Sequence, residues 1–156
     1  MQAYALNDEQ REIQALVRRL ARDKVAARAA AIDRSAEYPQ DMFDLLREVG
    51  LFTIPFPQKY GGTGSMLSAA VAVEEPGRVC YNTAYLLIVQ WVPFGAILAA
   101  GNDEQKRRLL GPLAAGELRG AFSTTEPQSG SDVAGIRTRA RRCDGGYRIS
   151  GSKIFI

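Results

Sequence analysis

A long uncharged stretch constrains this chain more than any other feature of its sequence. No Asp, Glu, Lys or Arg occurs between Val79 and Asn102, and residues 85–89 are strongly apolar. A segment of this length is either the central helix of a protein core or a membrane span. Gln90 and Pro93 interrupt its middle, and the flanking charges show no clear positive-inside bias. We therefore predict a buried core helix in a soluble protein, with a membrane helix as the alternative.

The residues before this stretch have the periodicity of amphipathic helices. Asn7 followed by Gln10 matches a capping box, and an apolar stripe follows at helical spacing. The stripe consists of Ile13, Leu16, Val17, Leu20 and Val25. A second helix is predicted from about Pro39 to Val49, ending at Gly50. Its inward residues are expected to be Met42, Leu45, Leu46 and Val49.

Two further helices are predicted on either side of the uncharged one. The first begins near Ser65 and should end or kink at Pro76, because proline lacks the N–H that a helix interior needs. The second begins at Asn102, which forms another capping box with Gln105, and runs to about Leu110.

The pattern changes from helical to β-prone after Gly116. Residues 120–125 are predicted to form a strand, and residues 136–143 and 147–150 alternate around an Asp-Gly-Gly turn, which predicts a hairpin. Residues 153–156 are predicted to start another strand, and a chain that stops inside an apolar strand looks truncated. Because two or three strands are marginally stable alone, this region should need more chain or a partner.

The predicted fold is therefore mainly α with a partial β domain. Residues 1–118 are expected to form an N-terminal helical bundle. Residues 119–156 are expected to form the first strands of a β-barrel-like domain.

Composition excludes several classes of site. The chain has no histidine, so it cannot form a Ser-His-Asp triad, a Cys-His pair or a histidine-ligated metal site. Its two cysteines, Cys80 and Cys143, have no metal-ligand spacing, and we expect no metal. The N-terminus lacks the basic and apolar regions of a signal peptide, and the net charge is a mild +3. These observations favour a reducing, cytoplasmic location.

The segment from Phe122 to Val133 is the most informative for chemistry. Ser and Thr hydroxyls and free backbone N–H groups follow a predicted strand, and Pro127 and Gly130 hold the loop open. Such a loop can donate hydrogen bonds to an anion or to a flat polar ligand. The alternative, which the residue types alone favour, is a set of turns whose hydroxyls bond their own backbone.

The same segment resembles a signature of the acyl-CoA dehydrogenases. The match consists of Thr125-Glu126-Pro127 followed by Gly130-Ser131-Asp132. Three other stretches resemble family motifs in the family's order: residues 57–64, residues 101–106 with 110–113, and residues 146–153. Together they cover essentially the whole chain.

This resemblance implies FAD as cofactor and an acyl-CoA thioester as substrate. The residues matching the flavin-facing wall are Phe122, Ser123, Thr124, Thr125, Gly130, Ser131 and Phe155. Groups at Thr124 and Thr125 would bond the polar edge of the ring and favour its reduced form. Ser131 would lie between the phosphate-bearing side chain of the flavin and the substrate, and Phe155 stands where the family usually has Trp. Tyr85 and Ile88 are candidates to face the acyl chain, although core packing explains them equally well.

The implied reaction is α,β-dehydrogenation, with FAD as hydride acceptor and a glutamate on a C-terminal helical domain as the base. No glutamate here matches that base: Glu126 belongs to the flavin loop, and Glu74 and Glu75 lie on a predicted surface helix. We therefore assign no catalytic residue, and we expect this polypeptide alone neither to retain FAD tightly nor to oxidise acyl-CoA. The resemblance further implies a homo-oligomer, dimer or tetramer, and electron-transfer flavoprotein or another electron acceptor as partner.

Other functions remain open at this point. The chain could be a non-catalytic remnant or assembly module derived from the family, and the motifs do not separate a dehydrogenase from an acyl-CoA oxidase or a nitroalkane oxidase. Arg137, Arg139, Arg141 and Arg142 could form a nucleic-acid patch, but no aromatic stacking platform accompanies them. A solvated hairpin face, with no nucleic-acid partner, is the preferred interpretation.

Overall fold

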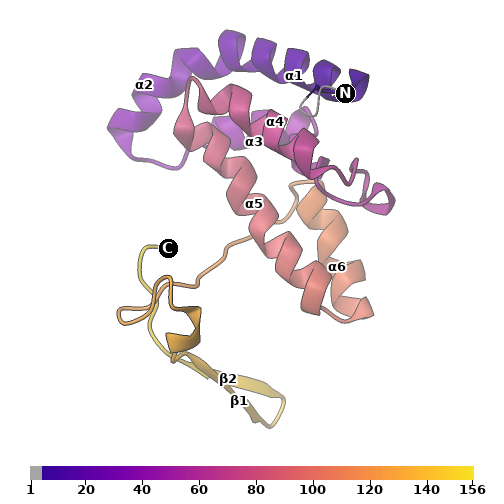
Figure 1. Cartoon of the computed structure of the whole chain (residues 1–156). Helices are drawn as coiled ribbons and strands as arrows, with labels where there is room; N and C mark the ends of the chain where they lie inside the picture. Colours follow the sequence, from indigo (N-terminus) through magenta and orange to yellow (C-terminus); the bar gives the residue numbers. More distant parts are fainter. Residues whose placement is uncertain (1–4) are drawn as a thin grey trace. The chain divides into compact units, whose positions relative to one another are not determined.

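The computed structural model describes residues 5–156, which divide into two compact units, one ending at Gly120 and the other comprising Ala121–Ile156. The first unit is helical, and the second contains a single hairpin (Figure 1). This arrangement confirms the predicted fold class, mainly α with a small β region.

The helical unit is built around α5 (Figure 1). Its helices are α1 (Asp8–Leu20), α2 (Ala26–Ser35), α3 (Gln40–Glu48), α4 (Met66–Gly77), α5 (Tyr81–Ala100) and α6 (Asp103–Ala114). α5 contacts α2, α3, α4 and α6, while α1 packs against α4. By length and composition α5 could cross a membrane, and it is the one such helix among residues 5–156. Its contacts with four other helices agree with the prediction of a core helix.

Short-range signals correctly predict the starts of α1, α4 and α6 and the end of α3, whereas α6 continues past its predicted end near Leu110 to Ala114. Asn7 with Gln10 and Asn102 with Gln105 both form complete capping boxes, and the Ser65 hydroxyl accepts a hydrogen bond from the N–H of Ser68. Gly50 follows α3 with a φ of 73°, in the left-handed region that glycine adopts without steric cost. Local pairs of residues therefore determine where these helices begin and end.

The first helix differs from its prediction in two ways. α1 leads into a π-helical turn, Ala21–Val25, and α2 follows directly, so the helical segment extends past Val25, the last residue of the predicted stripe. The extra residue in a π-turn shifts the register of the apolar stripe for the residues that follow the turn. Val17 and Val25 are fully buried, whereas Leu16 is 41% exposed, so its predicted inward position is wrong.

Two apolar clusters fill the helical unit. The larger contains residues of α1 to α5, and the smaller joins the segment at Phe56 to α5 and α6. In the smaller cluster the rings of Phe56 and Phe94 lie with their centroids 4.0 Å apart. Trp91 lies against both clusters and donates from Nε1 to the carbonyl oxygen of Phe52 at 2.9 Å. α5 thus connects the two parts of the core.

Gln90 explains why a polar residue interrupts the apolar helix. Its side chain is buried, and Nε2 donates to the carbonyl oxygens of Leu113 and Leu118 at 2.8 and 2.6 Å. Its Oε1 accepts from the N–H of Gly120 at 3.2 Å. One amide therefore satisfies three backbone groups, one in the last turn of α6 and two in the segment that follows it.

Glu75 does not lie on the helix surface, which corrects the prediction for this residue. It is 3% exposed and forms a bidentate ion pair with Arg18 of α1, at 3.0 Å to Nε and 2.7 Å to Nη2. The Arg18 guanidinium lowers the pKa of the Glu75 carboxyl. Glu74, its neighbour, is exposed as predicted. The arginine that buries Glu75 is 57 residues away in sequence, so helical periodicity alone could not reveal it.

A tight loop between α3 and α4 requires glycine at one position. A Cβ atom at Gly62 would lie 2.1 Å from the carbonyl oxygens of both Phe56 and Thr53. The Thr63 hydroxyl donates to the carbonyl oxygen of Ile54 at 2.9 Å and closes the same loop. This close backbone approach gives a steric reason for a glycine in the 57–64 motif.

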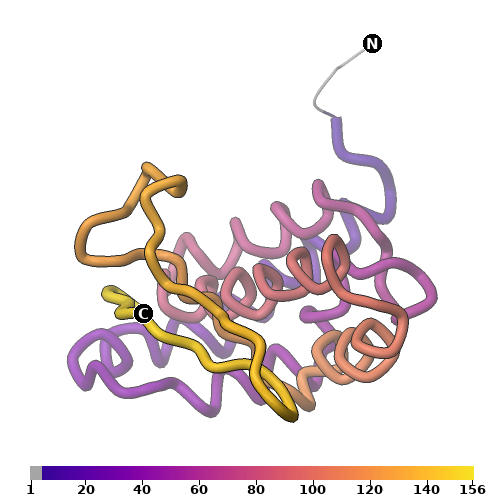
Figure 2. Tube along the Cα trace, turned by 90° about the horizontal axis from the view of Figure 1, so that it is seen from below, coloured from indigo at the N-terminus to yellow at the C-terminus, as the bar shows by residue number. Residues whose placement is uncertain are grey.

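The second unit contains the predicted hairpin and two irregular segments. Strand β1 (Arg139–Cys143) pairs antiparallel with β2 (Gly146–Ser150), and Figure 2 follows the same hairpin as a backbone trace. Within the described residues, 120–125 and 153–156 are not strands, so those two predictions are wrong. A single backbone hydrogen bond joins them, from Ile154 N–H to the Thr125 carbonyl at 3.0 Å. A β-prone sequence forms a regular strand only when a neighbour pairs along its length.

Candidate functional site

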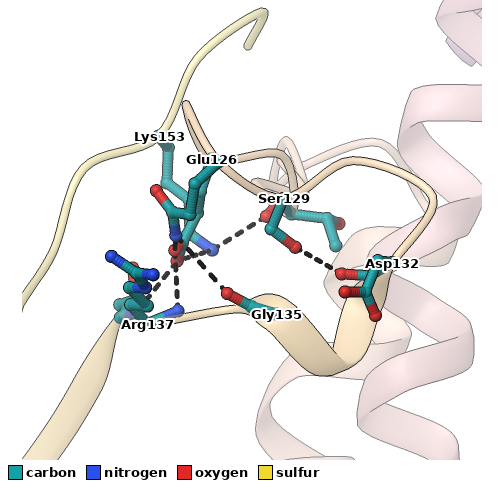
Figure 3. A network of polar contacts seen from close by, with 9 residues as sticks. Glu126, Ser129, Asp132, Gly135, Arg137 and Lys153 are labelled. Carbon is teal, nitrogen blue, oxygen red and sulfur yellow. Dashed lines mark hydrogen bonds and ion pairs between the residues drawn. The ribbon is translucent and has the colours of Figure 1, made fainter.

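Glu126 organises the segment that matches the flavin-loop motif (Figure 3). Its carboxylate is 3% exposed, although it lies in a small irregular unit. It accepts hydrogen bonds from the backbone N–H groups of Arg137 and Thr138 at 2.7 and 2.9 Å, and from Lys153 Nζ at 2.9 Å. The Gln128 amide donates to the same carboxylate. One acidic side chain thus joins three segments of the unit.

These donors also fix the charge of Glu126. Hydrogen bonds from Thr138 and from the Arg137 N–H, together with Lys153, hold the pKa of this carboxyl far below its usual range. A buried carboxylate that is fully paired remains ionised and accepts protons only at strongly acidic pH. Glu126 is therefore a structural anion and is not suited to act as a general base near neutral pH.

We refer to Glu126, Lys153 and the backbone N–H groups of Arg137 and Thr138 as the Glu126 clamp. This clamp brings two of the predicted flavin segments together. Lys153 Nζ also donates to the carbonyl oxygen of Thr124 at 2.9 Å, next to the bond between Ile154 and Thr125. Phe155 follows directly, with its side chain 91% exposed and a φ of 57°. A left-handed conformation is uncommon for phenylalanine and costs free energy. The same set of hydrogen bonds therefore holds Thr124 and Thr125 next to the segment of Phe155, which lies about 30 residues further along the sequence.

The 129–132 turn is fixed by a buried serine. Ser129 is 3% exposed; its N–H donates to the Glu126 carbonyl oxygen, and its hydroxyl donates to the Asp132 carbonyl oxygen. Gly130 and Ser131 lie at the outside of this turn and are exposed. The turn therefore presents Ser131 to solvent.

Known proteins identify this architecture. Residues 7–117 match the sequence model of the family described as "Acyl-CoA dehydrogenase, N-terminal domain". The chain belongs to the acyl-CoA dehydrogenase family. A relative in Bacillus subtilis, described as a probable acyl-CoA dehydrogenase, is 38% identical over 98% of this chain and 41% of its own length. The chain therefore spans about two fifths of the length of this relative.

Solved structures of family members have the same fold. Butyryl-CoA dehydrogenase from Megasphaera elsdenii superposes with a TM-score of 0.87 at 33% identity, over 97% of this chain and 41% of that one. A glutaryl-CoA dehydrogenase from Mycobacterium smegmatis, solved in complex with FADH2, superposes with a TM-score of 0.86 at 30% identity. That match covers 95% of this chain and 39% of the other.

The flavin-wall residues of this family member have the chemistry that a flat aromatic cofactor with a polar edge requires. Among residues 5–156, the side-chain hydroxyls of Thr124 and Thr125 bond no other protein group, and both residues are half-buried. The rings of Phe122 and Phe155 are 54% and 91% exposed, and Ser123 is exposed beside them. Unbonded hydroxyls and exposed rings fit an isoalloxazine ring, so these residues are compatible with FAD. The residue types alone favour turns whose hydroxyls bond the loop's own backbone. Among the described hydroxyls of this loop, only that of Ser129 does so, by donating to the Asp132 carbonyl oxygen.

The two acyl-chain candidates lie in the helical unit, on α5. Tyr85 and Ile88 are 45% and 37% exposed, so neither is a fully buried core residue. They line different hollows. Ile88 lines an apolar one of about 650 Å³ with Met66, Val73 and Trp91. Tyr85 stacks on Tyr81 and lines a separate hollow, next to Tyr38 and Pro39. The structure thus does not bring these two side chains into one pocket.

Sequence reasoning missed the residues that hold the site in shape. It placed Glu126 in the flavin loop without a role and gave none to Ser129 or Lys153. A usable signal was present, because Glu126 is the sole acidic residue of the otherwise neutral 122–131 segment. A carboxylate that is buried on folding requires a positively charged partner, and Lys153 supplies it.

Proposed function

We propose that this chain supplies the N-terminal portion of the cofactor and substrate site of an FAD-dependent acyl-CoA dehydrogenase. Family membership supports the reaction class. The observation that supports the site most directly is the Glu126 clamp, which holds Thr124, Thr125 and Phe155 on one support. In this proposal the clamp is the framework of the flavin wall.

Each residue of the wall has a proposed role. When bound, FAD supplies a hydride acceptor for the β-hydrogen of an acyl-CoA thioester. Thr124 and Thr125 bind the polar edge of the ring, helped by Ser123, while Phe122 and Phe155 cover apolar surface. Gly130 and Ser131 lie at the boundary between cofactor and substrate. Donors aimed at the ring edge stabilise negative charge that develops there.

Substrate contacts and the base complete the proposal. Ile88, in the apolar hollow on α5, contacts the acyl chain, and Tyr85 limits the space in the separate hollow that it lines. The proposal places the catalytic base outside these 156 residues, because no glutamate here matches the base of the family; the two buried glutamates, Glu126 and Glu75, are paired with Lys153 and Arg18. A homo-oligomer, a cytoplasmic location, and transfer of electrons to an electron-transfer flavoprotein or another acceptor are part of the same proposal.

A chimera tests this function. The matching N-terminal portion of the Bacillus subtilis relative is replaced by this chain, and the product is purified alongside the unaltered relative. We expect a yellow protein with the visible spectrum of bound flavin, which oxidises acyl-CoA in the presence of an artificial electron acceptor. The isolated 156-residue chain should be colourless and inactive.

A matched pair of variants separates wall residues from general folding. Thr124→Val with Thr125→Val removes both unbonded hydroxyls, so we expect weaker flavin binding and turnover at least about tenfold lower. Ser152→Ala removes an exposed hydroxyl of the same unit and should change neither. A chimera that folds and assembles like the relative but binds no flavin would contradict the proposal and favour a non-catalytic remnant or assembly module.

A further inference from the structure

One face of the hairpin gathers arginines without acidic residues. In the antiparallel register Arg141 lies opposite Arg148, and Arg139 lies opposite Ser150. Directly opposed side chains share a face of a sheet, as do alternate residues along one strand. These side chains, together with Arg137, line a single hollow of about 410 Å³. We refer to Arg137, Arg139, Arg141, Arg148 and Ser150 as the arginine face.

The arginine face has no counterion within the part of the chain that the structure describes. The guanidinium groups of its four arginines form no ion pair with a carboxylate of residues 5–156. Glu126, the acidic residue bonded to the Arg137 backbone, already accepts Lys153 and two N–H groups. Like charges directly opposite each other, as at Arg141 and Arg148, destabilise a strand pair. Every residue of both strands is exposed, so core packing does not explain this arrangement.

The opposite face of the hairpin has a different character. Ala140 lies opposite Ile149, and Arg142 lies opposite Tyr147 with its guanidinium 6.0 Å from the ring centroid. The aromatic and aliphatic side chains of the two strands, Tyr147, Ile149 and Ala140, are therefore all on this second face. The arginine face itself has no stacking surface for the bases of a single-stranded nucleic acid. Its size suits a compact ligand whose negative charges lie close together.

We propose that the arginine face is a binding site for a compact polyphosphate anion, such as the phosphates of a nucleotide or of coenzyme A. Guanidinium groups bind phosphate oxygens through paired, charge-assisted hydrogen bonds, and adjacent phosphoryl groups match arginines on neighbouring strand positions. The bound anion offsets the repulsion between Arg141 and Arg148. This site involves none of the proposed flavin-wall residues, and its occupancy is measurable without turnover.

Titration of the 156-residue chain tests the site. Tripolyphosphate, ATP and coenzyme A are titrated separately at low ionic strength and followed by calorimetry and by amide NMR shifts. We expect saturable binding at one site, with the largest shifts at residues 137–141 and 148–150. Tighter binding of coenzyme A than of ATP and tripolyphosphate would identify the CoA moiety as the source of the phosphates. Equal affinities for the three ligands would show that the site recognises only the polyphosphate group that they share. Both results support the proposal.

Two single variants that remove the same charge distinguish a site from diffuse attraction. Arg148→Gln should lower the affinity about tenfold, and Arg148→Lys should restore part of it. Arg142→Gln, on the opposite face of the same hairpin, should change the affinity less than about twofold. Arg148→Gln removes a repulsive pair, so it should leave the hairpin folded, which the amide spectrum will show. An equal loss in Arg142→Gln, the absence of saturation, or tighter binding of an acidic peptide or single-stranded RNA would overturn the proposal.

Discussion

At the scale of single residues, Glu126 shows how one buried charge can determine the conformation of a loop. Its carboxylate neutralises Lys153 and satisfies the N–H groups of Arg137 and Thr138, which precede β1. These bonds replace the regular ladder that a larger sheet would provide. The order of residues 124–138 therefore depends on a few charge-assisted hydrogen bonds, since little apolar burial supports this segment.

Replacing Glu126 by Gln should loosen the second unit. The neutral amide cannot balance Lys153, and its N–H₂ group faces backbone donors that need an acceptor. We expect hydrogen exchange at the Arg137 and Thr138 amides to become faster by about tenfold or more. Asp144→Asn is the control, because it removes an exposed carboxylate of the same unit and keeps a turn dipeptide that hairpins favour. Unchanged exchange in Glu126→Gln would show that the clamp does not order the loop.

The same carboxylate makes the order of this unit depend on pH. Its folded-state pKa is lowered relative to its ordinary value of 4.5. A lowered carboxyl pKa stabilises the folded state at pH values above the unfolded pKa, and the stabilisation is lost as the pH falls through the folded pKa. Exchange at Arg137 and Thr138, corrected for the intrinsic rate, should therefore be constant near neutral pH and rise as the pH falls below about 4.5. In Glu126→Gln this acid dependence should disappear, and its persistence would assign it to another group.

At the scale of elements, α5 is an apolar helix with one buried polar side chain, that of Gln90, which forms three hydrogen bonds to backbone groups. These groups lie at the end of the helical unit. A hydrophobic replacement would fit the surrounding core but would leave those groups without partners.

Gln90→Leu should therefore destabilise the helical unit in spite of its greater hydrophobicity. We expect a loss of about 2–4 kcal/mol in the free energy of unfolding, since up to three backbone groups lose a hydrogen bond. Urea unfolding followed by far-UV circular dichroism measures the change. Gln58→Leu, an exposed position in the same unit, should stay within about 0.5 kcal/mol of the parent. A neutral or stabilising Gln90→Leu would show that water replaces the amide at no cost.

Features defined by neighbouring residues were predictable, and those defined by distant partners were not. The two capping boxes, the stop at Gly50 and the Asp-Gly turn depend on residues within a few positions of each other, and all four are present. The burial of Glu75 depends on Arg18, and the irregular form of residues 120–125 depends on which strands lie beside them. Of the proposed site, the sequence therefore identified the wall residues by resemblance, while the clamp that supports them appeared only in three dimensions.

At the scale of the whole molecule, two units of different construction share one chain. The helical unit has two apolar clusters, whereas the described part of the second unit has one hairpin with all strand residues exposed. Residues 121–123 begin the second unit, are exposed and are not anchored by a backbone hydrogen bond within the described residues. This segment should be the most accessible part of the backbone.

Limited proteolysis with chymotrypsin should therefore cut first after Phe122. This side chain is 54% exposed, whereas Phe43, Phe52, Phe56 and Phe94 are each below 10%. Chymotrypsin also cleaves after tyrosine, but the exposed Tyr81 and Tyr147 lie in α5 and β2. Tyr38 is held by the Arg119 guanidinium over its ring and by the hydrogen bond from the Gln40 N–H to its carbonyl oxygen. Mass spectrometry should detect a stable fragment that ends at Phe122, and Phe122→Ala should slow its appearance. Cleavage after Phe155 removes one residue and is distinguishable by mass. Early cuts within α1 to α6 would contradict this accessibility.

The pairing of Glu126 also affects the electrochemistry of any redox cofactor bound nearby. A carboxylate that changed protonation near neutral pH would alter the local potential and would couple electron uptake to proton uptake at that position. Because Glu126 remains ionised and balanced by Lys153, its contribution to the field stays constant across the physiological range. For a redox centre bound next to Glu126, the charge of this side chain would therefore shift the midpoint potential by the same amount at every physiological pH.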